Sequence, residues 1–295
     1  MIILEKYRVE HIPEAIRLID YCIGLFPQLP TRNAVKKSIK RKELFHNDQL
    51  ALTGTWMKTD DEITLVDQET TVPKAYPMEI PVLYEDAFIA VVHKPSGLVV
   101  SGNQFRTLVN ILVTNLTKSR EKDAYKWARP VHRLDSATSG LVIVAKTAKA
   151  HARLGELFEN RAIDKTYSAL VQGKPSHQEI STKIDGKEAF TRMTVLKSER
   201  SLRNEFVSLI ELKPSTGRTH QLRIHCAQVG HPIIGDKIYG IEGEVMSHKG
   251  LFLCAQKLKF RHPITNEELE VSMPVPPKFS ALLEREKRRW EVKQD

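Results

Sequence analysis

Residues 132–146 read His-Arg-Leu-Asp-Ser-Ala-Thr-Ser-Gly-Leu-Val-Ile-Val-Ala-Lys. The acidic residue Asp135 follows the cation Arg133 by two positions and begins a small polar turn. The apolar run 141–145 is too short for a helix of its own and predicts a buried strand. A carboxylate held rigidly in such a turn could act as a reactive group, but Asp also caps turns through its side chain. On these residues alone capping is favoured, because short motifs recur by chance.

The composition predicts a soluble globular protein of one large or two ordinary domains. Of the 295 residues, 41% are hydrophobic and 27% are charged. No apolar run is long enough to cross a bilayer and residues 1–4 are too short for a signal peptide, so we expect a cytoplasmic protein that does not enter the membrane. Cys22, Cys226 and Cys254 are scattered, which argues against a disulfide framework or a cysteine zinc site.

The net charge of +9 indicates an acidic partner, nucleic acid first. Thr31 predicts the N-cap of a helix over 32–42, with Val35 and Ile39 facing inward. The cations of this helix share its outer face: Arg32, Lys36, Lys37, Lys40 and Arg41. Charge runs are usually solvated surfaces, but cations on one face bind phosphates in a salt-dependent way. We favour RNA binding.

The segments around this basic helix resemble the S4 RNA-binding domain over about residues 10–67. An earlier helix is predicted by apolar residues at helical spacing: Ile12, Ile16, Ile19, Ile23 and Phe26. A turn at Asn47-Asp48 and a strand over 62–66 follow. The Gly-rich turn usual in that family is replaced by Asn47-Asp48-Gln49. The resemblance implies an RNA-binding module over residues 1–70.

A proline-containing linker over 71–81 then predicts a domain boundary, and residues 82–295 form the larger unit. Short apolar or alternating runs predict its strands, near 88–92, 141–145, 165–171, 191–196, 206–212, 251–255 and 269–271. Helices are expected at 107–112, at 151–158 with Thr147 as the cap, from about 220 to Gly230, and at 281–290.

Four further motifs accompany residues 132–140. They are Lys94-Pro95-x-Gly97-Leu98, Lys165-x-Tyr167, Gly217-Arg218-Thr219-His220-Gln221-x-Arg223-x-His225 and Gly230-His231-Pro232-Ile233-x-Gly235-Asp236-x-x-Tyr239-Gly240. In this order and spacing, over about residues 80–280, they resemble the RluA family of RNA pseudouridine synthases. Several ordered matches are far more specific than one, so the capping interpretation of Asp135 gives way to a functional one.

The resemblance implies an α+β protein, whose catalytic domain has a large, mainly antiparallel mixed sheet and follows the small S4-like domain. It implies that uridine in RNA becomes pseudouridine: the N1–C1′ bond breaks, the base turns, and C5 rejoins C1′, with no cofactor and no metal. Asp135 matches the catalytic carboxylate, and Arg218 the cation paired with it. Tyr167 matches the tyrosine that stacks on the base and whose hydroxyl could help remove the C5 proton, although a strand tyrosine is usually core.

The target uridine must leave its stack before it can react. Arg133 matches the position that contacts the vacated space, with a phosphate contact or a simple ion pair as the alternative. His132, which is expected to order the loop, is assigned to RNA binding together with His220 and Gln221. Ribosomal RNA of the large subunit is favoured over transfer RNA by analogy with S4-bearing members. A monomer is expected.

Three other classes of protein remain to be weighed. A metal site built on His220, His225 and His231 lacks an acid or cysteine to complete it. A hydrolase of glycosidic bonds usually needs a second carboxylate, which these motifs do not supply. The main alternative is a non-catalytic RNA-binding or ribosome-assembly factor, and the presence of Asp135, Tyr167 and Arg218 together argues against it.

Overall fold

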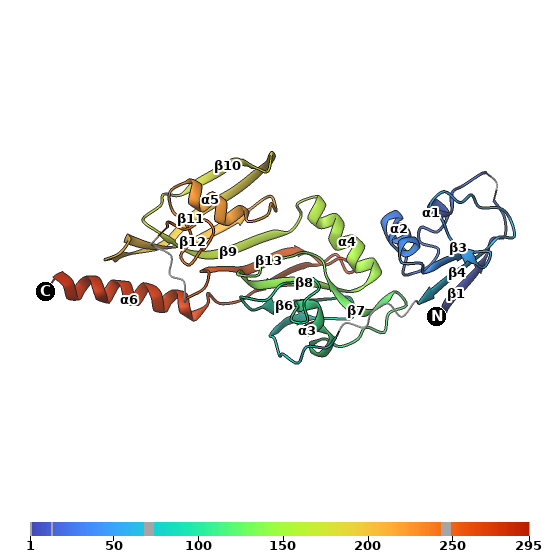
Figure 1. Ribbon diagram of the computed structural model, residues 1–295, viewed down its shortest axis with the longest axis horizontal. Coiled ribbons are helices and arrows are strands. Elements are labelled where there is room, and N and C mark those ends of the chain that lie inside the picture. The colour runs from blue at the N-terminus through green and yellow to red at the C-terminus, as the bar shows by residue number, and fades with distance from the viewer. Residues whose placement is uncertain (1, 13, 68–73, 243–248, 295) are drawn as a thin grey trace.

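The computed structural model describes residues 2–12, 14–67, 74–242 and 249–294, and its elements form two units with separate hydrophobic cores (Figure 1). The N-terminal unit lies at one end of the molecule and the C-terminal helix at the other. Each unit combines helices with a sheet, so the α+β class predicted from the sequence is confirmed. In these ranges, no helix has the length and apolar character needed to cross a membrane.

The N-terminal unit contains a four-stranded antiparallel sheet in the order β1-β4-β2-β3. Its strands are β1 (Ile2–Arg8), β2 (Leu44–His46), β3 (Gln49–Leu50) and β4 (Glu62–Asp67). Asn47 and Asp48 join β2 to β3 with φ values of 48° and 61°, the left-handed geometry of a tight hairpin turn. The predicted turn and the strand over 62–66 are therefore confirmed, whereas β1 was not predicted.

The basic helix α2 (Arg32–Lys40) is confirmed, with the Thr31 hydroxyl accepting a hydrogen bond from the Ala34 N–H at 3.2 Å. The long helix predicted over residues 12–26 is wrong. Only α1 (Leu18–Tyr21) is helical there, among the described residues. The backbone before it is extended, because the Ile16 carbonyl accepts from the Met57 N–H and Arg17 forms a β-bridge with Trp56. The apolar side chains reach the core through turns instead.

The larger unit is built on a ten-stranded sheet with the path β10-β11-β12-β9-β13-β8-β6-β5; β14 pairs with β13, and β7 with β8. The strands are β5 (Val82–Glu85), β6 (Ile89–Lys94), β7 (Ala124–Pro130), β8 (Ser139–Thr147), β9 (Asp164–Gln172), β10 (Gln178–Ile184), β11 (Lys187–Ser201), β12 (Glu205–Pro214), β13 (Leu253–Arg261) and β14 (Glu268–Ser272). Among these described strands, pairing is antiparallel except between β8 and β13. The mainly antiparallel mixed sheet is as predicted, although β5, β7 and β10 were missed.

The parallel contact between β8 and β13 fixes the centre of this sheet. Ala255 of β13 is in register with Gly140 of β8 on one side and with Tyr167 of β9 on the other. Gly140 has φ +123°, and a Cβ atom there would lie 2.3 Å from the Ala255 carbonyl oxygen. Only glycine allows so close an approach. Ala255 of β13 therefore lies between the strand that follows the Asp135 turn and the strand that holds Tyr167.

The helices of the larger unit are α3 (Leu108–Asn115), α4 (Ala148–Glu159), α5 (Gln221–Gln228) and α6 (Pro277–Gln294), and each corresponds to a predicted helix. The Thr147 hydroxyl caps α4 as predicted, by accepting from the Ala150 N–H at 3.2 Å. Residues 71–73 of the predicted linker lie outside the described ranges. Residues 74–81 pack on α3, where the Tyr76 N–H donates to the Asn110 carbonyl.

Candidate active site

A cavity of about 350 Å³ opens beside the β8–β13 junction, within the size range of ligand sites. The sequence motifs at residues 132–140, 165–167 and 217–225 all contribute to it. Its polar lining includes Arg133, Asp135, Lys165, Tyr167, Arg218, His220 and Arg223, and its apolar walls include Leu134, Phe158, Pro214, Leu222 and Leu253.

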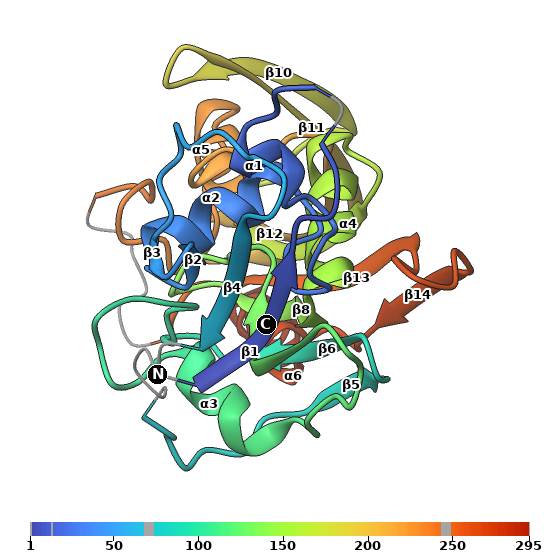
Figure 2. The same cartoon turned by 90° about the vertical axis from the view of Figure 1, so that its right-hand side faces the viewer.

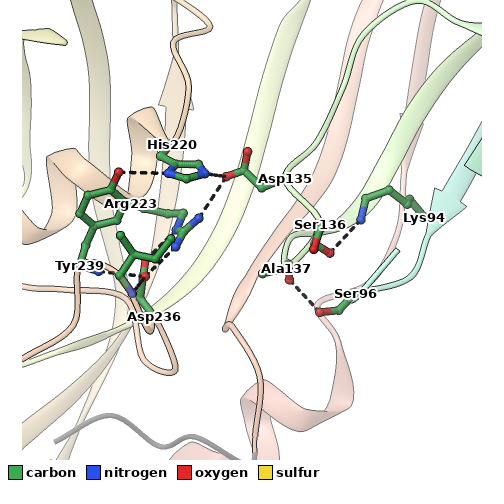
Figure 3. Close-up of polar contacts among 10 residues, drawn as sticks. Lys94, Ser96, Asp135, Ser136, Ala137, His220, Arg223, Asp236 and Tyr239 are labelled. Carbon is green, nitrogen blue, oxygen red and sulfur yellow. Dashed lines mark hydrogen bonds and ion pairs between the residues drawn. The ribbon is translucent and has the colours of Figure 1, made fainter. Parts of the chain in front are cut away.

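Asp135 faces the side chains of Arg223 and His220 (Figure 3). Its Oδ2 lies 3.5 Å from Nη1 of Arg223 and 3.8 Å from Nε2 of His220, and its side chain is 24% exposed. The turn itself is closed by the main chain, since the Thr138 N–H donates to the Asp135 carbonyl at 3.0 Å. The carboxylate is thus directed at the cavity.

A buried lysine holds the Asp135 turn against the neighbouring loop. The ammonium of Lys94, at the end of β6, donates to three main-chain carbonyls, those of Pro95, Leu98 and Ser136. The Ser96 hydroxyl adds a bond to the Ala137 carbonyl at 2.7 Å (Figure 3). Burial lowers the pKa of Lys94 to about 8, against the opposing effect of Asp135. These bonds fix the turn from the side opposite to Arg223 and His220.

Arg223 is held in place by a buried ion pair with Asp236. Its Nε and Nη2 donate to the two carboxylate oxygens of Asp236, each at 2.7 Å, and both side chains are almost fully buried. Asp236 also accepts from the N–H groups of Ile238 and Tyr239. Burial alone would raise the pKa of Asp236, but these hydrogen bonds lower it. The pair leaves Nη1 of Arg223 directed at Asp135.

The prediction that Arg218 pairs with Asp135 is corrected, because Arg223 occupies that position. Arg218 lines the same cavity, but its Nε donates to the Glu188 carbonyl at 3.1 Å. The reason is the start of α5 at Gln221: Arg218 lies in the turn before the helix, whereas Arg223 lies in its first turn and is buried. Both arginines are in the motif, and only the helix start distinguishes them.

Tyr167 lies on β9 and lines the cavity beside Asp135. Burial, and secondarily the charge of Asp135, raise the pKa of its hydroxyl. The hydroxyl is therefore protonated at neutral pH, which favours the stacking role of the ring over a role as a base.

Comparisons with known proteins identify the family of this chain. A family profile described as RNA pseudouridylate synthase matches residues 89–228. A Bacillus subtilis protein named uncharacterized RNA pseudouridine synthase YlyB is 34% identical, over 80% of this chain and 85% of the relative. The chain belongs to the RluA-type RNA pseudouridine synthase family. It is an enzyme that isomerises uridine to pseudouridine in RNA, as predicted.

Other relatives of this synthase carry more specific names. Ribosomal large subunit pseudouridine synthase C of Rickettsia bellii is 30% identical, over 91% of this chain and 97% of the relative. Synthase D of Xanthomonas campestris is 31% identical, over 82% and 86% respectively. The solved structure of human RNA pseudouridylate synthase domain containing 1 has a TM-score of 0.55 and 28% identity, and covers 67% of this chain and 84% of that one.

Two residues assigned to RNA binding have internal partners in this synthase. Gln221 is 4% exposed, and its amide bonds to four groups of the protein: Thr216, Arg218, Phe190 and Thr191. A direct contact of Gln221 with RNA is therefore corrected to a role in shaping the loop.

His132 is likewise occupied, since its Nε2 accepts from the Ile143 N–H at 2.9 Å and its ring packs on Phe158. Burial, together with the charge of Lys165, lowers the pKa of His132 to about 4, so the ring is neutral. This agrees with the expected ordering of the loop and contradicts an ionic contact with phosphate.

The remaining predicted residues lie at accessible places. Arg133 is exposed at the rim of the cavity, and the side chains of Arg32, Lys36, Lys37 and Lys40 are exposed on α2. The three histidines of the rival metal site lie in different environments: His220 contacts Tyr239, His225 contacts Thr191, and His231 contacts the Gln172 carbonyl. The sequence motifs include Lys94, Asp236 and Tyr239 but predict no role for them. Their partners are brought near only by the fold.

Proposed function

We propose that this synthase isomerises uridines in ribosomal RNA of the large subunit, with Asp135 as its catalytic carboxylate. The observation that carries the assignment is the position of Asp135, which lies in the cavity beside Tyr167 and is held between Arg223 and the turn fixed by Lys94. Asp135 acts at C1′ of the target nucleotide, either as a nucleophile or as a base on the sugar.

Each neighbour has a part in the reaction that its position supports. Arg223 orients Asp135, and its charge stabilises the negative charge that develops on the detached uracil. The ring of Tyr167 stacks on the base, while Arg133 at the rim contacts the RNA where the uridine has left its stack. Arg218 also lines the cavity and is available to a flanking phosphate.

The N-terminal unit, which we regard as an S4-like module, provides a second contact with RNA. Its helix α2 presents four exposed cations: Arg32, Lys36, Lys37 and Lys40. The two units touch where the Gln28 amide donates to the Lys122 carbonyl at 3.2 Å. The charge of Lys37 also reaches His151 of α4, whose pKa is lowered to about 4 by burial and by Arg129 and Lys37. Lys37 of α2 and Arg129 of the catalytic domain therefore both lie near His151, so the positive surface extends from one unit to the other.

The substrate class rests on relatives named as large-subunit enzymes, which align with most of the chain. The synthase would act as a cytoplasmic monomer. A map of pseudouridines in total RNA from cells with and without the gene tests the substrate directly. We expect one or a few sites in large-subunit RNA to disappear. Loss confined to transfer RNA would overturn the assignment of ribosomal RNA as the substrate, and an unchanged map would overturn the whole proposal.

The role of Asp135 is tested by Asp135→Asn in the same cells and with purified protein. The variant keeps the shape of the side chain but loses its charge, so we expect no detectable product while RNA affinity stays within about threefold of wild type. Restoration of the missing sites by wild type, and not by this variant, is the expected result. Product at the wild-type rate would contradict the assignment of Asp135.

A further inference from the structure

His220 contacts Asp135 from a strained backbone position. Its φ of 55° and ψ of 18° are left-handed, a conformation that is uncommon outside glycine and is concentrated at functional sites. Although His220 is the N-cap residue of α5, its side chain caps no N–H of the helix. The imidazole instead lies between Asp135 and Tyr239, with Nε2 on the side of the carboxylate (Figure 3).

Tyr239 is itself fixed by the ion pair that holds Arg223. Its N–H donates to Asp236 at 3.1 Å, and its ring lies 5.2 Å from the Arg223 guanidinium. Its hydroxyl lies 3.0 Å from Nδ1 of His220, with the two rings edge to face at 5.7 Å. Both groups that contact Asp135 are therefore braced by one short segment, residues 236–239.

The Asp135 carboxylate and the Tyr239 hydroxyl together favour one position for the imidazole proton. With the proton on Nδ1, the lone pair of Nε2 would face a negatively charged oxygen of Asp135, which is repulsive. With the proton on Nε2, that N–H points at Asp135 and Nδ1 accepts from the Tyr239 hydroxyl. If the ring is protonated, Nδ1–H donates to the same hydroxyl, which can accept as well. The hydroxyl thus supports both states without any change in ring orientation.

We propose that Tyr239 is a positioning residue that keeps the Nε2–H of His220 directed at Asp135, so that His220 is a second donor to this carboxylate beside Arg223. The proposal rests on the assigned role of Asp135. The distance of 3.8 Å from Nε2 to Oδ2 exceeds a direct hydrogen bond, and such contacts commonly shorten when substrate binds. Two donors at different angles fix the direction of the carboxylate toward C1′ better than one.

The imidazole nitrogens of the free enzyme test this directly by NMR. In protein with ¹⁵N-labelled histidine, the His220 signals, assigned by their absence in His220→Gln, should report the proton on Nε2. In Tyr239→Phe they should report a mixture of the two neutral forms. A proton on Nδ1 in the wild type, or an unchanged pattern in Tyr239→Phe, would overturn the proposal. This readout is independent of whether Asp135 is the catalytic group.

Kinetics with RNA supply the second test. Tyr239→Phe keeps the ring and its contact with Arg223, so we expect kcat to fall about 10-fold with KM nearly unchanged. His220→Gln retains an N–H donor but has no tautomer to be set, so it should keep more activity than His220→Ala. In the Gln background, Tyr239→Phe should have almost no further effect. Equal effects of Tyr239→Phe in both backgrounds would reduce Tyr239 to a structural role and contradict the proposal.

Discussion

At the scale of single residues, the site depends on one guanidinium that has two acidic partners. Arg223 uses two of its nitrogens on Asp236 and a third on Asp135. Only the planar fork of arginine can make a bidentate pair and still present a further N–H. This explains why an arginine, and not a lysine, can hold both carboxylates from this position.

We therefore expect Arg223→Lys to be far more damaging than Arg218→Lys. A lysine keeps the charge but cannot bridge both acids, so kcat should fall about 100-fold and the free energy of unfolding by about 2 kcal/mol. Arg218→Lys is the matched control, and its kcat should stay within about threefold of wild type. Single-turnover assays and urea unfolding measure the two effects. A larger loss in Arg218→Lys would restore Arg218 as the partner of Asp135.

The Arg223–Asp236 pair also predicts how stability depends on pH. Because the pKa of Asp236 is lowered in the folded protein, its ionised form stabilises the fold at any pH above the unfolded value of about 3.9. This contribution is lost as the pH falls through the lowered folded value. Urea unfolding should show wild type more stable than Asp236→Asn near neutral pH, with the difference shrinking below about pH 4. A difference that is independent of pH would contradict this account.

At the scale of elements, the site is placed by the pairing of three strands, β8, β13 and β9. Ala255 of β13 is in register with both Gly140 and Tyr167, so the Asp135 turn and the tyrosine are brought together by main-chain pairing. Helix α5 then supplies His220 and Arg223 from the opposite side. The precision of the site therefore depends on how closely β8 approaches β13.

Gly140→Ala tests this close approach. The new Cβ would overlap the Ala255 main chain at a φ of +123°, so we expect a loss of about 3 kcal/mol in stability, or about 9 °C in Tm, together with lower activity. Gly155→Ala on α4 is the control, since a Cβ there meets no atom within 4 Å. It should be neutral or stabilising by up to about 1 kcal/mol. Similar Tm values for the two variants would contradict the packing argument.

At the scale of the whole molecule, the chain forms two units with separate cores, and we propose that both bind the same RNA. Viewed along the long axis, the N-terminal unit lies in front of the catalytic domain (Figure 2). The chain carries a net charge of +9, and four of its exposed cations lie together on α2. Cations at this distance from the cavity can change affinity without changing the chemistry.

Reversal of charge on α2 should separate binding from catalysis. With Lys36, Lys37 and Lys40 all changed to Glu, we expect RNA affinity to fall at least about 10-fold and the salt dependence of binding to weaken. The rate on a short stem-loop at saturating RNA should be nearly unchanged. The control reverses three exposed cations of α6, Lys287, Arg288 and Lys293, and should bind more tightly than the α2 variant. Equal affinities of the two variants would contradict a second contact of α2 with RNA.

Much of this protein could be predicted from local sequence. Helix caps such as Thr31 and Thr147, the turn at Asn47-Asp48 and the apolar strand after Asp135 depend on interactions between near neighbours in the chain, which the residue types themselves specify. The motifs also placed Asp135 and Tyr167 in the cavity. The predicted helix over residues 12–26 was wrong because long-range pairing with Trp56 and Met57 determined that backbone.

The sequence by itself determined which groups could form the site: a carboxylate in a turn, a strand tyrosine and a motif rich in cations. Only the tertiary structure decided which cation meets Asp135. Arg218 and Arg223 are five residues apart and chemically identical, so the choice depends on where α5 begins and on the buried position of Asp236. Likewise, Tyr239 reaches His220 across 19 positions of sequence. Such contacts are made by packing between elements, and the order of residues along one element does not specify them.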